Sequence, residues 1–322
     1  MPRNVPVDPP KTVVVALGGN ALALANEPAT ISNQFRHTRE SLAPIVELAR
    51  AGWNIALVHG NGPQIGDELI RNETSVGLVE PLPLGVLVAG TAGWIGYMIQ
   101  QSLQNALRHA GIDRPVVTLV TQTEVDPADP QLHIPVKRAG HPLDADRAHR
   151  LEARGVPVKL DADGVHWHRL TVSPVPIGVV EASLVERLVG TGVIVIAAGG
   201  GGPPVYRDPA GDLEGVDGVV DKDRVSAVLA RDLHAEVLII LTEADAVYRG
   251  WGTPSAAAIR SMTLAEADAL LASGTLEKGS IAPKVEAGAA FVRFGGERAI
   301  IAKLSEGLAA LEGRTGTTIV RT

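Results

Sequence analysis

The chain has 322 residues, of which 45% are hydrophobic, and it carries a formal net charge of -7 with a pI near 5.7. This acidic balance argues against a general nucleic-acid-binding protein, which normally presents a basic face. The chain contains no cysteine, which excludes disulfides, thiolate catalysis and cysteine-ligated metals. No window reaches the roughly 18 apolar residues of a membrane span, and no apolar leader is evident. We therefore expect a cytoplasmic protein.

Short apolar runs that end in glycine or polar residues alternate with longer amphipathic stretches along the chain. This alternation is typical of a mostly parallel sheet packed between helices, and it predicts a single α/β domain over residues 1–322. The predicted strands cover residues 12–17, 54–59, 116–122, 193–198, 237–242, 298–302 and 317–320. The predicted helices cover residues 37–51, 89–109, 221–233 and 263–274. Asp221 and Thr263 are the predicted N-terminal caps of the last two helices.

Residues 126–178 interrupt this alternation. They are rich in proline, histidine and charge, and they contain the turn signals DPADP and DADG. So little continuous apolar surface does not predict a strand layer of the core. We expect a small protruding subdomain, inserted between two strands of the sheet and able to cover a ligand at the strand ends.

Three glycine-rich segments, at residues 18–20, 60–62 and 199–202, each follow a predicted strand. Consecutive residues without a Cβ expose backbone N–H groups, to which a phosphate can come very close. The carboxyl ends of parallel strands converge, so the three segments together indicate one polyanion held from several sides. An ordinary tight turn remains the alternative for any single segment. Neither a P-loop nor a GxGxxG motif follows the first strand, which disfavours the common NTPase and dinucleotide sites.

Phosphoryl transfer requires positive charge near the migrating group, and lysine is scarce in this chain. Lys222 lies between Asp221 and Asp223, whose carboxylates can orient its ammonium or hold a magnesium ion with its waters. Lys284 falls in the first turn of a predicted helix, where a cation opposes the helix dipole and where anion binding would explain it. Lys137 belongs to the protruding segment. Surface salt bridges for Lys222 and a solvated loop charge for Lys137 are the alternatives.

The motifs ALGGNAL, HGNGPQIG, VTQTEVD, IAAGGGGPPV, VVDKD, LTEADAV and GSIAPKVEA occur in the order, and close to the spacing, of the carbamate kinases. From residue 12 to residue 320 the chain resembles this branch of the amino acid kinase superfamily. The resemblance implies a three-layer αβα sandwich with an open, mostly parallel central sheet, a small protruding lobe and a homodimeric assembly. It also implies reversible transfer of a phosphoryl group from ATP to carbamate, giving ADP and carbamoyl phosphate. Mg²⁺ is expected to be carried mainly by the nucleotide, with no protein ligand directly assigned.

The resemblance also assigns roles to residues at matching positions. The residues expected to be catalytic are Lys137, Lys222 and Lys284. Those expected around the transferred phosphoryl group are Gly18, Gly19, Asn20, Gly60, Asn61 and Gly62. Those expected to bind the nucleotide are Gly200, Gly201, Gly202, Asp221, Thr242, Ala244, Asp245 and Val247. No protein nucleophile is needed, because the carbamate oxygen attacks ATP directly and the enzyme supplies positioning and electrostatic stabilisation.

The chain departs from the family pattern around the acceptor. PTKPIG is replaced by PVKRAG at 135–140, the triplet before GMIGY reads GTA at 90–92 instead of MSQ, and VVPSP appears as TVSP at 171–174. These departures leave two alternatives open: a different carboxylate, carbamate or phosphate acceptor, and a regulator that binds nucleotide or metabolite without turnover. Arg138 is a hypothetical ligand of an acceptor carboxylate. His166 and His168 predict a surface hairpin rather than a zinc site, because no third ligand lies nearby in sequence.

Overall fold

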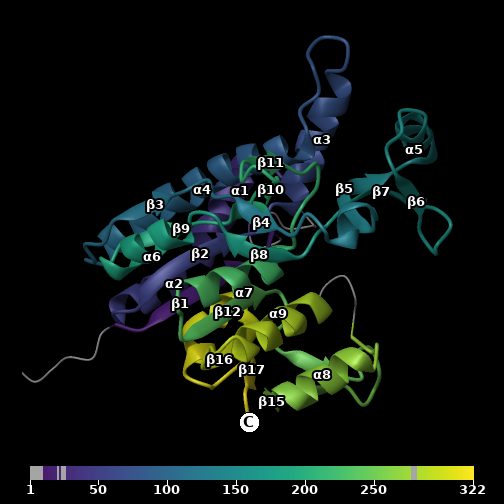
Figure 1. Ribbon diagram of the computed structural model, residues 1–322. Helices are drawn as coiled ribbons and strands as arrows, with labels where there is room; N and C mark the ends of the chain where they lie inside the picture. The colour runs from purple at the N-terminus through teal and green to yellow at the C-terminus, as the bar shows by residue number, and fades with distance from the viewer. Residues whose placement is uncertain (1–9, 20–21, 23–26, 277–280) are drawn as a thin grey trace, which may run out of the picture.

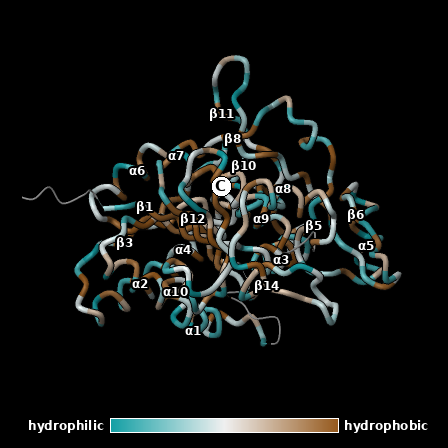
Figure 2. Tube along the Cα trace, turned by 90° about the horizontal axis from the view of Figure 1, so that it is seen from below, coloured by the Kyte–Doolittle hydropathy of each residue, from teal (hydrophilic) through white to brown (hydrophobic). Residues whose placement is uncertain are grey.

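The computed structural model describes residues 10–19, 22, 27–276 and 281–322. Its centre is an eight-stranded sheet in which all neighbouring strands pair in parallel except β16 and β17. The order across the sheet is β15 (Ser261–Thr263), β17 (Thr317–Val320), β16 (Arg298–Lys303), β12 (Val237–Thr242), β1 (Thr12–Leu17), β2 (Asn54–His59), β9 (Ile194–Ile196) and β3 (Val116–Thr118). The middle strands are apolar except at their ends, as expected for strands buried on both faces (Figure 2).

Two helical layers cover the sheet and bury opposite faces of the same strands (Figure 1). Val14 and Ala16 of β1 pack in the core lined by α6 (Ala182–Gly190), α7 (Lys222–Asp232), α8 (Leu264–Ala272) and α9 (Ala282–Arg293). Val13 and Val15 pack on the other side, in the core lined by α2 (Ala43–Arg50), α4 (Leu84–His109) and α10 (Gly307–Leu311). This is the αβα sandwich that the sequence predicts.

Several boundaries differ from the predicted ones. The helix expected over 37–51 is two helices, α1 (Ile31–Ser41) and α2, because Pro44 lacks an N–H and fits only the first turn of a new helix. The helix expected from residue 89 already begins at Leu84. The strands expected over 116–122 and 193–198 are shorter, and β9 ends before the left-handed residue Ala198. The predicted caps of α7 and α8 are confirmed, and Thr263 forms a full capping box with Glu266.

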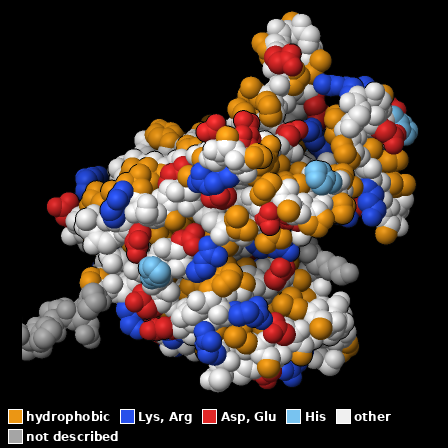
Figure 3. Space-filling view, in the orientation of Figure 1, with side chains coloured by type: hydrophobic (Ala, Val, Ile, Leu, Met, Phe, Trp, Pro, Cys, Tyr) orange, Lys and Arg blue, Asp and Glu red, His pale blue; other side chains and the backbone are white. Residues whose placement is uncertain are grey.

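A lobe protrudes from one end of the sandwich (Figures 1 and 3). It consists of β5 (Lys137–Leu143), α5 (Ala145–Glu152), β6 (Val158–Leu160) and β7 (Trp167–Thr171), with a small apolar core of its own. The ends of the segment predicted to protrude behave differently. β8 (Pro176–Val179) pairs with β4 (Thr123–Val125) in a second sheet that also contains β10 (Pro204–Arg207) and β11 (Leu213–Gly215).

The structure also fixes the surroundings of the histidine pair of the lobe. His166 contacts Asp163 through Nδ1 at 2.6 Å, and Nε2 of the buried His168 lies 3.0 Å from Oδ2 of Asp161. Neither histidine belongs to a metal-binding cluster among the described residues. Among these described residues, no helix is both long enough and apolar enough to cross a membrane.

Candidate active site

The first and second glycine turns lie against each other at the carboxyl ends of β1 and β2. The N–H of Gly18 donates to the carbonyl of Leu241 at 3.2 Å, and that of Gly60 donates to the carbonyl of Leu17 at 2.9 Å. A Cβ placed on Gly60 would lie 2.8 Å from the backbone nitrogen of Gly19, closer than real side chains allow. Glycine is therefore required here. Asn20 lies outside the described residues.

Asn61 occupies the N-cap position of α3 (Gly62–Thr74) without a side-chain capping bond, and Pro63 lies in the first turn of this helix. The side-chain Nδ2 of Asn61 donates to the hydroxyl of Thr91 at 2.9 Å, and Thr91 is fully buried in α4. Thr91 is the middle residue of the triplet that departs from the family pattern. A hydroxyl at that position is thus retained, and it orients the amide of the second glycine turn.

The glycine run 199–202 is buried directly behind Asn61. Gly200, Gly201 and Gly202 have φ values of 68°, 93° and 72°, in the left-handed region that favours glycine. A Cβ on Gly200 would lie 2.2 Å from Nδ2 of Asn61, and one on Gly201 would lie 2.3 Å from the carbonyl oxygen of Val220. The groups that pack closely on the backbone of the glycine run are thus side chains and carbonyls of the protein itself. The run supports the second glycine turn, and this geometry gives no support to its predicted contact with the nucleotide.

Lys222 and Lys284 share one carboxylate. Nζ of Lys222, at the start of α7, donates to Oδ1 of Asp223, and Nζ of Lys284, in the first turn of α9, lies 3.1 Å from Oδ2. The side chain of Asp223 is only 5% exposed. Burial by itself would raise the pKa of Asp223, but the two ammonium groups lower it below its usual value. The ionised carboxylate therefore holds two positive charges together.

The third lysine comes from the lobe and contacts the other carboxylate of VVDKD. Lys137, the first residue of β5, donates through Nζ to Oδ2 of Asp221 at 2.5 Å. Asp221 is at the same time the N-cap of α7 and accepts from the N–H groups of Asp223 and Arg224. Burial opposes its ionisation, but Lys137, Lys222 and the N–H of Arg224 lower the pKa of Asp221 to about 2. Asp221 thus joins the lobe to the helix that carries Lys222.

His59, the last residue of β2, lies under this site. It is fully buried, and Nδ1 lies 3.0 Å from the carbonyl oxygen of Gly60. Burial, with a smaller contribution from Lys222, lowers the pKa of His59 to about 4. The imidazole is therefore neutral at pH 7. A Cβ on Gly199 would lie 2.5 Å from its Nε2, so the ring packs tightly against the third glycine run.

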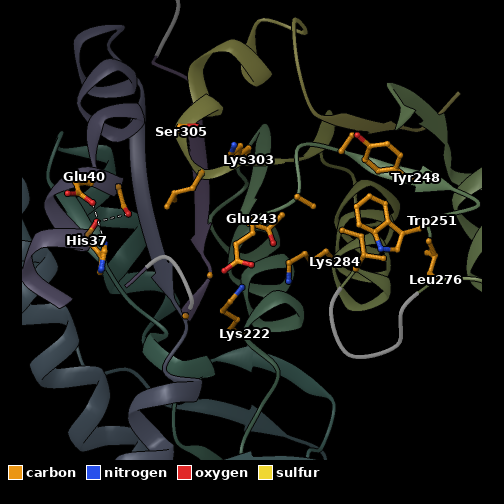
Figure 4. Close-up of a pocket in the computed structure, with 18 of the residues that line it drawn as sticks. His37, Glu40, Lys222, Glu243, Tyr248, Trp251, Leu276, Lys284, Lys303 and Ser305 are labelled. Carbon is orange, nitrogen blue, oxygen red and sulfur yellow. Dashed lines mark hydrogen bonds and ion pairs between the residues drawn. The ribbon is translucent and has the colours of Figure 1, made fainter. Parts of the chain in front are cut away.

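A cavity of about 1030 Å³ opens beside the lysines (Figure 4). Of the predicted residues, its walls contain Gly18, Gly19, Lys222, Thr242, Ala244 and Lys284. Asp245 and Val247 are not in the walls: the carboxylate of Asp245 accepts from the hydroxyl of Tyr248, and the N–H of Val247 donates to Thr317. The sequence interpretation of these two residues as nucleotide ligands gains no support from the cavity.

The cavity walls also contain residues that sequence reasoning missed, among them Glu243, Tyr248, Trp251, Leu276 and Lys303. Lys303 ends β16 in register with Thr242 of β12, so its position at a strand end was an available signal. The aromatic rings of Tyr248 and Trp251 lie with centroids 5.0 Å apart, on the side of the cavity opposite His37 and Glu40 (Figure 4). No local pattern links these residues, because the cavity walls come from distant parts of the chain.

Comparison with known proteins identifies the family. The model of the amino acid kinase family matches residues 11–303. A carbamate kinase of Pyrococcus horikoshii is 41% identical over 313 residues, which cover 96% of this chain and 99% of the relative. The structure of the carbamate kinase of Giardia lamblia bound to AMP-PNP superposes with a TM-score of 0.90 at 34% identity, covering 97% of this chain and 99% of that one. The chain belongs to the carbamate kinase branch of the amino acid kinase family.

Not every similar protein is named simply a carbamate kinase. A carbamate kinase-like protein of Escherichia coli, YqeA, is 38% identical over 313 residues and covers 96% of this chain and 99% of its own. The acceptor-side residues therefore need their own examination in any member of the carbamate kinase branch. Arg138, the residue hypothesised to bind an acceptor carboxylate, donates through Nη2 to Asp161 of the lobe at 2.6 Å, and its side chain is 61% exposed. The structure gives this hypothesis no support.

Proposed function

We propose that this protein is a carbamate kinase, a phosphotransferase that interconverts ATP plus carbamate and ADP plus carbamoyl phosphate. The observation that supports this most directly is the pairing of Lys222 and Lys284 on the buried carboxylate of Asp223, beside the first glycine turn. Two clustered ammonium groups suit a phosphoryl group, whose charge is spread over its equatorial oxygens in the transition state. Sequence identity of 41% to a carbamate kinase over nearly the whole chain supports the same reaction.

In the proposed reaction, an oxygen of carbamate attacks the γ-phosphorus of ATP as the bond to the β–γ bridging oxygen breaks and ADP leaves. Backbone N–H groups of the glycine turns and the ammonium groups of Lys222 and Lys284 would stabilise the charge on the transferred group. Lys137 would approach from the lobe side, where its ammonium already lies on Asp221. No step requires a protein nucleophile, so positioning and electrostatics provide the acceleration.

The residues around the second glycine turn favour carbamate over a larger acceptor. Arg138, the additional cation that distinguishes this chain, is engaged by Asp161 within the lobe. The hydroxyl of Thr91, which replaces the middle serine of the family triplet, keeps its contact with Asn61. No specific observation favours the alternative of a non-catalytic regulator, since the three lysines and the glycine turns are all present.

Mg²⁺ fits this site as an ion carried by nucleotide phosphates. Within the described ranges, no group of three or more acidic or histidine side chains is placed to hold a metal ion by itself. The carboxylates of Asp221 and Asp223 are occupied by lysines. Glu243, beside Lys222 and Lys284 in the cavity wall (Figure 4), would face such an ion. Bound Mg²⁺ would neutralise phosphate charge.

We also propose a homodimer that acts in the cytoplasm, where its nucleotide substrates are found. The family resemblance suggests the dimer, and α4 offers apolar surface for it. This helix buries most of its apolar side chains but leaves Val86 and Tyr97 about half exposed, at 50% and 56%. Light scattering on the purified protein would test the oligomeric state.

ATP formation from ADP and carbamoyl phosphate, followed with a luciferase assay, tests the proposed reaction. Acetyl phosphate and phosphorylated amino acid analogues serve as a parallel panel of donors. The proposal requires carbamoyl phosphate to give the highest kcat/KM. It is refuted if another donor is preferred, or if no turnover occurs in either direction although calorimetry shows that ADP binds.

A further inference from the structure

The second glycine turn and the lobe are connected through a single helix. α3 begins at Gly62, within the turn, and runs along β5 of the lobe to Thr74. The two elements lie close together at these glycines: a Cβ on Gly140 would lie 3.1 Å from Cδ1 of Leu69 and 3.5 Å from Cα of Gly66, and Gly140 has a φ of 82°. The ring of His141 covers Gly66, and its Nε2 lies 2.9 Å from Oδ1 of Asp67. The helix and the strand therefore have little room to slide.

At the far end of α3, Glu73 binds two arginines of the lobe. Arg147 of α5 donates to its Oε2 through both Nε and Nη2, at 2.9 and 2.6 Å. Nη1 of Arg169, on β7, lies 3.7 Å from Oε1. Each oxygen of one carboxylate on the body thus faces a guanidinium from a different element of the lobe. Figure 3 shows acidic and basic side chains gathered in the notch between α3 and the lobe.

These groups are largely removed from solvent. The side chains of Glu73, Arg147 and Arg169 are 15%, 22% and 20% exposed. Burial lowers the pKa of Arg169, and the Glu73 carboxylate opposes this effect, as does Asp217, while Arg154 and Arg147 add to it. Desolvated ion pairs contribute little net stability, but they fix one geometry where an apolar contact would accept several. Such a cluster suits an orienting role better than a stabilising one.

The cluster is linked to Lys137 through the sheet of the lobe. β5 and β7 pair antiparallel, with Lys137 opposite Thr171 and Ala139 opposite Arg169. Arg169 therefore lies two residues along β7 from the partner of Lys137. When Glu73 holds Arg169, it also holds the end of β5 from which Lys137 reaches Asp221.

We propose that Glu73 is a positioning residue for phosphoryl transfer. It locks the lobe onto α3 through Arg147 and Arg169, and so keeps Lys137 in register with the second glycine turn at the other end of the same helix. The inference rests on the proposed function for its kinetic consequence. Its structural content, a lobe orientation set by the Glu73 carboxylate, can be tested without any activity.

The kinetic test replaces Glu73 by Gln, which keeps the shape but removes the charge. We expect kcat/KM for carbamoyl phosphate to fall roughly tenfold to a hundredfold, because small displacements of a catalytic group are costly. KM for ADP should stay within about twofold, since no lobe residue lines the large cavity. Glu68→Gln is the matched control: Glu68 is on the same helix and, among the residues that the structure describes, pairs with Arg71 of that helix alone. Arg147→Lys, which keeps the charge but loses the two-point contact, should show a smaller loss in the same direction.

A double-mutant cycle separates positioning from a general structural effect. In a Lys137→Ala background, Glu73→Gln should change kcat/KM by less than about twofold, because the group that it positions is gone. Equal losses in both backgrounds would show that Glu73 does not act through Lys137 and would overturn the proposal. Thermal unfolding of each variant verifies that the sandwich is folded.

The absence of cysteine from the chain allows a clean distance measurement. Spin labels at Glu152→Cys on α5 and Ala269→Cys on α8, both exposed positions, report the distance between lobe and body. Glu73→Gln should broaden this distance distribution, and Glu68→Gln should not. An unchanged distribution in the Glu73 variant would refute the proposal. If the wild-type protein proves inactive on carbamoyl phosphate, the proposed function fails, but this measurement still decides whether Glu73 sets the lobe.

Discussion

Asp223 determines how the positive charge of the site is arranged before any substrate binds. Its buried carboxylate lies between the ammonium groups of Lys222 and Lys284, which would otherwise repel each other. The same residue is in the first turn of α7, where the helix dipole favours a negative charge. Two cations can therefore be held a few ångströms apart at small cost, ready to contact the phosphates of a ligand.

Lys222→Ala and Lys284→Ala should each lower kcat for ATP formation on the order of a thousandfold, because each removes a charge that acts on the transition state. Stopped-time luciferase assays at saturating substrate measure the effect. Lys11→Ala is the control: Lys11 pairs with Glu297 at the surface with a side chain 53% exposed, and its loss should leave kcat unchanged. Near-wild-type rates in either site variant would remove that lysine from the mechanism.

From the lowered pKa of the buried His59, we expect the free energy of unfolding to fall in mild acid. Its pKa falls from an ordinary value of 6.5 to about 4 in the folded protein, so the unfolded chain binds the proton more readily. The contribution of neutral His59 to the free energy of unfolding is therefore complete above pH 6.5 and is lost as the pH falls toward 4. At about 1.4 kcal/mol per pKa unit, it amounts to on the order of 3 kcal/mol. Urea unfolding at several pH values should show this decline, and His59→Gln should flatten it. An unflattened decline would assign the effect to other groups.

At the scale of the element, the glycine run 199–202 turns a buried strand end into support for a neighbouring loop. Ala198 already has a φ of 51°, and the following glycines continue in left-handed conformations. The turn lets Asn61, Thr123 and the carbonyl of Val220 pack directly on the backbone. Side chains here would push α7, with Lys222, away from the second glycine turn.

Gly201→Ala should lower the free energy of unfolding on the order of 3 kcal/mol, because the added Cβ meets a backbone carbonyl and the residue keeps a positive φ. Chemical denaturation measures the change. Gly190→Ala is the matched control: it is the last residue of α6, and its added Cβ meets no atom within 4 Å. There alanine should stabilise the helix by up to about 1 kcal/mol. Equal effects at the two positions would contradict the steric argument.

At the scale of the whole molecule, the site is assembled from two parts. The sandwich supplies the cavity, Lys222 and Lys284, and the lobe supplies Lys137. The contacts between the parts include the ion pair between Lys137 and Asp221, the seam between α3 and β5, and the ion pair between Glu73 and Arg147. This division suggests that the nucleotide and the acceptor are recognised by different parts of the fold.

Lys137→Ala should therefore separate binding from chemistry. The dissociation constant for ADP should stay within about twofold of the wild-type value, because Lys137 does not line the cavity. The kcat for ATP formation should fall about a hundredfold, as expected on loss of one charge-stabilising donor. Calorimetry and the luciferase assay measure the two quantities. A large loss of ADP affinity would mean that the lobe takes part in nucleotide binding.

The sequence by itself determines the layers, the glycine turns and the first-turn caps, because these depend on neighbours in the chain. Apolar strands, Pro63 and Asp221 specify their local structure whatever surrounds them. It also points to the lysines of the site, since few lysines accompany strand ends. The resemblance to carbamate kinases rests on the same local motifs.

Only the tertiary structure decides which groups face one another across the chain. Asp221 meets Lys137 from 84 residues away, and Glu73 meets Arg147 from 74 residues away. Packing also places Gly200 against the side chain of Asn61, and turns Arg138 toward Asp161. Such contacts depend on how whole elements pack, and periodicity and spacing report only what lies within one element. The chain thus encodes its chemistry locally, and the fold decides the partners of each group.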